Sequence, residues 1–89
     1  MLKKIIVGEF AGSKFTVENT WLSGAKLFHG SELIATNNDT FAVKKDKAMI
    51  RAKVIVNEVE RVVEVFAFAI LTVKLQIKVD GEKIAGDEF

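Results

Sequence analysis

Few residues of this chain could carry acid–base or nucleophilic chemistry. His29 is the only histidine and there is no cysteine, which excludes a thiol nucleophile and thiolate metal ligands. As a general base His29 would need a nucleophile, but neither Ser23 nor Ser31 lies in the strained elbow of a catalytic serine. As a metal ligand beside Glu32 it would lack a third partner. The sequence therefore predicts no catalytic and no metal-binding residue, and we expect His29 to be a turn residue.

Carboxylates are the second class of candidates. Glu58 and Glu60 are two residues apart, and Glu60 and Glu64 four; paired carboxylates hydrolyse glycosides when they face each other across a pocket. On a strand, however, this spacing places them on one solvated face. A second acidic group lies near the end of the chain and comprises Asp80, Glu82, Asp87 and Glu88. Its spacing does not match an EF-hand calcium loop, so we expect a turn and a solvated tail there.

Charge and motifs exclude several kinds of partner. The net charge is +1, from 13 basic and 12 acidic residues, whereas nucleic-acid-binding domains carry a clustered basic excess. The run Lys44-Lys45-Asp46-Lys47 has only Phe41 near it, so it favours a solvated loop over a base-stacking surface. Gly8 and Gly12 lack the third glycine and the helix of a dinucleotide-binding motif. We therefore predict no nucleic-acid partner and no cofactor.

Length and composition indicate the class of protein. With 89 residues, the chain is expected to form a single domain over residues 1–89. The longest uncharged run, residues 65–73, is far shorter than the roughly 20 apolar residues of a membrane-spanning helix. The absence of cysteine favours the reducing cytoplasm. We therefore predict a cytoplasmic domain without a membrane span.

The elements that would position these residues are predicted to be strands. The chain is rich in Val, Ile and Thr and contains no proline, and β-branched residues suit a pleated surface. Residues 72–79 alternate strictly between apolar and polar, as in a strand with one buried face. The other candidate strands are residues 3–7, 13–18, 25–28, 32–36, 41–44, 49–56, 60–66 and 82–85. We predict an all-β fold, a small antiparallel β-sandwich of about seven or eight strands.

Two similar phrases, "KLFHGSELIA" and "KVDGEKIAGDEF", predict two β-hairpins. Their turns are placed at His29-Gly30 and Asp80-Gly81, because hairpin turns need residues that tolerate positive φ. Gly24, after Ser23, is predicted to form a further turn. The likeness is too short to indicate an internal duplication.

The segment 57–69 admits two interpretations. Asn57 and Glu60 could form the N-terminal capping box of a helix, which would make the fold α+β. The alternation of residues 63–69 instead favours a strand, with Val63, Val65, Ala67 and Ala69 in the core. On that strand Phe66 and Phe68 would face outward and form an apolar patch.

The candidate partner surface therefore comprises Trp21, Phe66 and Phe68. Aromatic residues are favoured at protein interfaces, and a two-fold contact over the two phenylalanines would cover the patch, so we expect a homodimer. The leading hypothesis is a non-enzymatic domain that binds a protein partner or itself. The alternative is a β module that binds a small ligand or lipid in an apolar interior.

The order of these features resembles the β-sandwich domain of the Fas apoptotic inhibitory molecule family. The resemblance is carried by "FTVENTWLSGAKLFHGSEL" and "VKLQIKVDGEKIAG", with Ser23-Gly24 before a strand and Asp80-Gly81 after one. It covers roughly residues 15–84, and His29-Gly30 departs from the family's usual Asp-Gly turn. The resemblance implies a β-sandwich that acts through protein contacts, without a catalytic centre.

Overall fold

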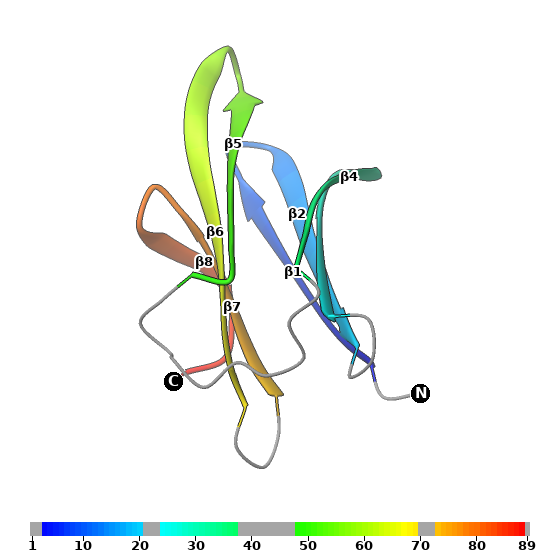
Figure 1. Ribbon diagram of the computed structural model, residues 1–89. Helices are drawn as coiled ribbons and strands as arrows, with labels where there is room; N and C mark the ends of the chain where they lie inside the picture. Colours follow the sequence, from blue (N-terminus) through cyan, green and yellow to red (C-terminus); the bar gives the residue numbers. More distant parts are fainter. Residues whose placement is uncertain (1–2, 21–23, 38–47, 70–72, 89) are drawn as a thin grey trace.

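The protein is an all-β sandwich of two antiparallel sheets. The computed structural model describes residues 3–20, 24–37, 48–69 and 73–88. Sheet A has the order β1-β2-β3-β4 and sheet B the order β5-β6-β7-β8, and the sheets form two layers (Figure 1). The strands are β1 (Lys3–Phe10), β2 (Ser13–Thr20), β3 (Gly24–His29), β4 (Glu32–Asn37), β5 (Ile50–Val56), β6 (Val59–Ala69), β7 (Val73–Val79) and β8 (Glu82–Gly86).

The predicted fold class is confirmed, and the helical alternative over residues 57–69 is wrong. That segment forms the β5–β6 turn and the long strand β6. The valine-rich sequence favours this outcome, because β-branched side chains lose rotamer freedom in a helix. The predicted strand 41–44, the basic run 44–47 and Trp21 lie outside the described residues.

Two-residue turns set the register of the hairpins. Asp80 and Gly81 have φ of 50° and 86°, as a type I′ turn requires, so this turn falls where the sequence predicts. In the other hairpin the turn lies one residue later than predicted, at Gly30-Ser31, and His29 is the last residue of β3. Gly24 has a φ of 75° and begins β3.

The core lies between two matching rows of side chains. Across sheet A the paired residues are Ile6, Val17, Leu27 and Ala35. Across sheet B they are Ile50, Val65, Ile77 and Ala85. All eight belong to the hydrophobic core or pack against it, and Val17, Leu27, Val65 and Ile77 are fully buried. Burying each such side chain stabilises the fold by about 1.5–3 kcal/mol.

The two sheets are structural repeats of each other. In each, a four-stranded meander ends in a hairpin with a two-residue turn and a register shift at the same place, before Phe28 in sheet A and before Lys78 in sheet B. A backbone hydrogen bond from Gly30 N to Lys14 O has its counterpart from Asp80 N to Val62 O, both 2.8 Å. The short likeness in the sequence is therefore part of a repeat that covers each half of the described structure.

Glycine allows the sheets to meet at one edge. β1 and β8 belong to different sheets but lie side by side. Gly8 of β1 is buried, and a Cβ there would lie 2.8 Å from the Ala85 Cβ and 3.1 Å from Ile84. At the opposite edge, Asn37 Nδ2 of β4 donates a hydrogen bond to the Met49 carbonyl beside β5. The core is thus covered along both edges.

Gly8→Ala tests the close approach of β1 and β8. Because the added methyl would overlap Ala85, we expect the free energy of unfolding to fall by about 1–3 kcal/mol. The control is Glu9→Ala, at the exposed neighbouring position, with an expected change within about 0.5 kcal/mol. Urea denaturation measures both; equal stability of the two variants would contradict the close approach.

Glu58→Gly tests the β5–β6 turn. Asn57 and Glu58 have φ of 51° and 66°, a region in which a side chain costs about 1–2 kcal/mol. Asn-Gly is the preferred pair for a type I′ turn, so we expect a gain in unfolding free energy of about 1 kcal/mol. Glu58→Ala removes the same charge but keeps the Cβ, and should show no such gain. A glycine variant no more stable than the alanine variant would argue against this turn.

Candidate interaction surface

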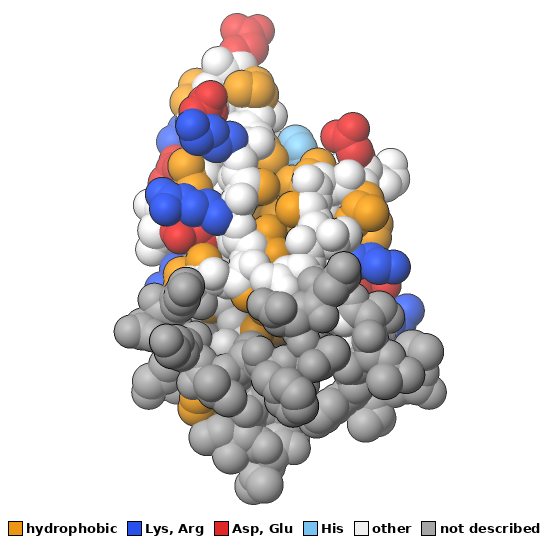
Figure 2. Space-filling view, viewed as in Figure 1, with side chains coloured by type: hydrophobic (Ala, Val, Ile, Leu, Met, Phe, Trp, Pro, Cys, Tyr) orange, Lys and Arg blue, Asp and Glu red, His pale blue; other side chains and the backbone are white. Residues whose placement is uncertain are grey.

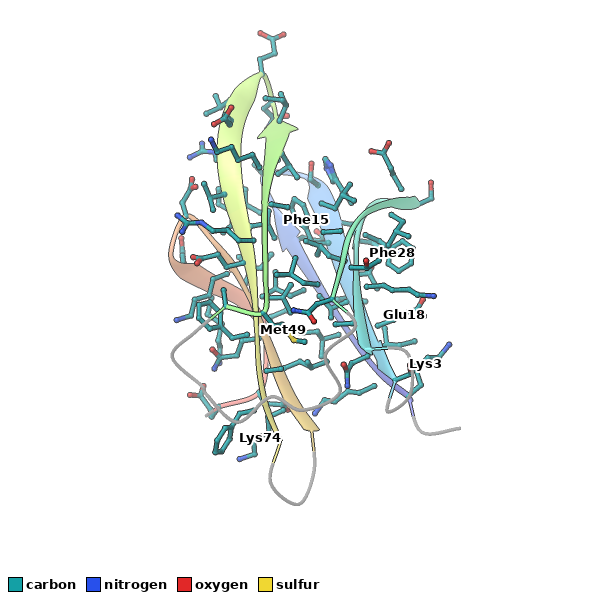
Figure 3. The ribbon with its side chains drawn as sticks, viewed as in Figure 1. Lys3, Phe15, Glu18, Phe28, Met49 and Lys74 are labelled. Atoms are coloured by element: carbon teal, nitrogen blue, oxygen red, sulfur yellow. The ribbon has the colours of Figure 1, made fainter. Side chains whose placement is uncertain are left out.

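The outer face of sheet A carries an apolar row. Val7, Thr16, Phe28 and Leu33 are paired across all four strands. Val7 is 51% exposed and Leu33 47% exposed, while Thr16 and Phe28 are half-buried. Figure 3 shows Phe28 pointing outward from sheet A, whereas Phe15 lies between the sheets. Alternation explains the difference, because Phe15 pairs with His29 on the inner face.

Charged and apolar side chains flank the apolar row on the same face. On one side lie Glu9 of β1 and Lys14 of β2, which are directly opposite each other in the strand register. On the other side Ile5, which is 49% exposed, is paired with Glu18, and Glu18 is paired with Lys26. Lys3 Nζ is 3.7 Å from the Glu18 carboxylate. An apolar centre with a charged rim is the arrangement found at protein interfaces.

The equivalent row on sheet B is charged. Its members, paired in the same register, are Arg51, Glu64, Lys78 and Lys83. Figure 2 shows Lys, Arg, Asp and Glu side chains along the side of the molecule formed by β5 and β6. The inner rows of the two halves thus match, while their outer rows differ in chemistry. The members of both outer rows are exposed or half-buried and point away from the core, so the apolar row has no role in packing the core.

Phe66 and Phe68 do not form the exposed patch that the sequence predicts. Phe66 does lie on the outer face of β6, opposite Gln76, but it is only 9% exposed. The Lys78 ammonium lies 4.8 Å from the centre of its ring, a cation–π contact. Phe68 is half-buried. Lys78 therefore contacts the Phe66 ring within the chain. Trp21 lies outside the described residues.

Two other exposed apolar residues lie near the tip of the β5–β6 hairpin. Ile55 is paired with Glu60, whereas Val59 is paired with Val56. Ile55 and Val59 therefore point to opposite faces and do not form one patch. The apolar row of sheet A is the larger continuous apolar feature of the two.

His29 contributes to packing. Its ring stacks on Phe15, with centroids 4.7 Å apart and planes 15° apart, and its strand partner across the turn is Glu32. Ser31 lies in the exposed turn. This arrangement serves aromatic stacking at the end of the core.

Asp80 ties its turn to the neighbouring hairpin. Its carboxylate accepts hydrogen bonds from Val62 N and Arg61 Nη1, both 2.9 Å. The Val62 amide, and then Arg61, lower the pKa of Asp80 below its ordinary value of 3.8. Arg61 occupies a core-facing position opposite Val54, and its guanidinium lies 5.2 Å from the Phe10 ring centre. Asp80, Arg61 and Phe10 thus pack together at one end of the core.

Asp87 joins the end of the chain to both sheets. Its carboxylate accepts a hydrogen bond from Lys4 Nζ of β1 at 2.6 Å and from Leu75 N of β7 at 3.0 Å. Its carbonyl accepts one from Gln76 Nε2 at 2.7 Å. The Lys4 hydrogen bond, followed by that from Leu75, lowers the pKa of Asp87 below 3.8.

Asp80, Asp87 and Glu88 each form an ion pair with a lysine or arginine. Glu88 forms an ion pair with Lys83 at 2.8 Å, and Glu64 is paired with Arg51 and Lys78 on the outer face of sheet B. Glu58 lies in the β5–β6 turn. Within residues 3–20, 24–37, 48–69 and 73–88, no three His, Asp or Glu side chains are arranged to hold a metal ion.

The sequence gives little warning of the apolar row. In β1, Ile5, Ile6 and Val7 are consecutive apolar residues, so alternation does not reveal which of them faces outward. In β3, Leu27 and Phe28 pose the same problem. Pairing with β2 settles both cases, since Ile6 and Leu27 flank the buried Val17.

Comparisons with protein-family models, curated proteins and solved structures found no match. The resemblance to the Fas apoptotic inhibitory molecule family stays a prediction. In the part of the chain that the structure describes, no helix has the length and apolar character needed to cross a membrane.

The Asp87 contacts predict a dependence of stability on pH. Because the folded-state pKa lies below 3.8, the stabilisation is present above that pH and is lost as pH falls through the folded value. As the pH falls below 3.8, we expect the unfolding free energy of the parent to decrease more steeply than that of Asp87→Asn. The two curves should converge at low pH, where Asp87 is protonated. Urea denaturation at a series of pH values measures the slopes.

Lys4→Met provides the matched comparison, because it removes the largest cause of the lowered Asp87 pKa. We expect it to reduce the parental pH dependence in the same direction as Asp87→Asn. A slope unchanged in both variants would show that the Lys4–Asp87 contact contributes nothing to stability.

Proposed function

We propose that the protein is a non-enzymatic interaction domain, and that the outer face of sheet A is its docking face. The proposal rests on one contrast: the outer row of sheet A is largely apolar, whereas the equivalent outer row of sheet B is charged. Val7 and Leu33 occupy the positions that Arg51 and Lys83 occupy on the other sheet. The same fold accommodates charged residues there, so folding alone does not require apolar ones.

The physical cost of the apolar row supports the same proposal. With Ile5, Val7 and Leu33 each about half exposed, the patch is on the order of a few hundred Å², a size that often marks a binding site. Phe28 lies at its centre and is half-buried, and aromatic residues in such positions often dominate binding energy. Covering the row would remove this surface from water at about 25 cal/mol per Å².

The alternative, a module for a small ligand or lipid, has less support. Such a module needs an open apolar interior, whereas Phe15, Leu27 and Leu75 are fully buried between the sheets. Our proposal also omits an enzymatic activity and a nucleic-acid partner, as the sequence predicts. We retain the cytoplasm as the expected compartment, on the absence of cysteine.

Site-specific photo-crosslinking tests the docking face. A photoreactive phenylalanine analogue replaces Thr16, at the centre of the apolar row, or Glu64, at the equivalent position of sheet B. In cells that express the protein, we expect strong crosslinks to protein from position 16 and weak ones from position 64. Equal yields at both positions, or none at position 16, would overturn the proposal.

A further inference from the structure

We infer that two copies of this chain associate face to face through the apolar row, around a two-fold axis parallel to the row. The inference rests on the proposed docking face and names its occupant, a second copy. It replaces the homodimer expected over Phe66 and Phe68, because Phe66 is covered within its own chain.

The charges of β2 are complementary to themselves under a two-fold rotation. A two-fold axis along the row places each residue of the row opposite the same residue of the second copy. It also places each flank of the face opposite the other flank of the second copy. On β2 the flanks are Lys14 and Glu18, equally far from Thr16 and on the same face. Lys14 of one copy would therefore lie over Glu18 of the other, and the pairing would occur twice.

The position of these charges strengthens the argument. β2 is an inner strand of sheet A, between β1 and β3, so the two charge pairs would lie near the middle of the contact. Lys14 and Glu18 are about 13 Å apart along one strand, too far for an ion pair within one chain. Within the chain Lys14 neighbours Glu9, and Glu18 neighbours Lys26 and lies 3.7 Å from Lys3. A contact between Lys14 and Glu18 themselves, however, requires a second molecule.

The size of the face predicts a weak dimer. Four strands about 4.8 Å apart and roughly 25 Å long offer on the order of 500 Å² per copy. Two copies would bury about 1,000 Å², at the lower limit for a specific interface. We therefore expect a dissociation constant on the order of 10 μM.

Analytical ultracentrifugation of the full chain tests the association. The parent is expected to shift from monomer to dimer as its concentration rises through about 10 μM. Val7→Ser/Leu33→Ser should remain monomeric. The matched control, Arg51→Ser/Lys83→Ser, changes the equivalent exposed positions of sheet B and should dimerise like the parent. Circular dichroism checks that each variant is folded.

A charge exchange tests the orientation. Lys14→Glu alone, or Glu18→Lys alone, would place like charges opposite each other twice and should weaken dimerisation about tenfold. The double variant Lys14→Glu/Glu18→Lys restores opposite charges and should restore the parental dissociation constant. Lys3 also lies near Glu18, so the double variant is compared in the Lys3→Met background, where the same restoration is expected.

Three results would overturn the inference: a parent that stays monomeric well above 100 μM, equal dimerisation of the two serine double variants, or a charge exchange that does not restore association. None of these three results would by itself refute the proposed docking face. A monomeric parent whose position 16 still crosslinks to a different protein would refute the second copy as occupant while supporting the proposed function.

Discussion

The fold depends on the mutual burial of two equivalent aliphatic rows. Neither sheet can bury its inner face alone, because a four-stranded meander has no second layer of its own. The row through Val17 and Leu27 therefore meets the row through Val65 and Ile77, and all four side chains are fully buried. Short turns fix the register of each row. A shift of one residue would move the buried side chains of a whole strand to its solvent face. Strand order, pairing and the choice of outward-facing residues all follow from this contact.

Once the inner rows are in place, the outer rows are free to differ. The half formed by β1–β4 presents Val7, Phe28 and Leu33, whereas the half formed by β5–β8 presents charges in the same register. A charged outer face meets water without cost and discourages association. An apolar outer face on an otherwise matching framework is the feature that packing does not explain, and the proposed docking face rests on it.

Two of the acidic residues that first suggest chemistry, Asp80 and Asp87, connect elements of the fold. Asp80 holds its turn against Val62 and Arg61, while Asp87 ties the end of the chain to Lys4 and Leu75. Each carboxylate accepts a hydrogen bond from one backbone amide of an inner strand of sheet B, Val62 of β6 or Leu75 of β7, and so satisfies a donor of the main chain. The ion pairs are partly exposed, so we assign them modest stability and a larger part in orienting neighbouring segments.

The sequence by itself determined the strands with clean alternation, above all β7, and the Asp80-Gly81 turn. In β7 the alternation of apolar and polar residues allows only one face of the strand to be buried. At the turn, Asp and Gly both tolerate the positive φ that the two positions need. Only the tertiary structure decided the faces of Ile5, Ile6 and Val7, the burial of Phe66 beneath Lys78, and the core-facing position of Arg61 beside Phe10. Alternation divides a strand into two faces but does not say what covers each. That depends on long side chains from neighbouring strands and on the second sheet, which come together only when the chain folds.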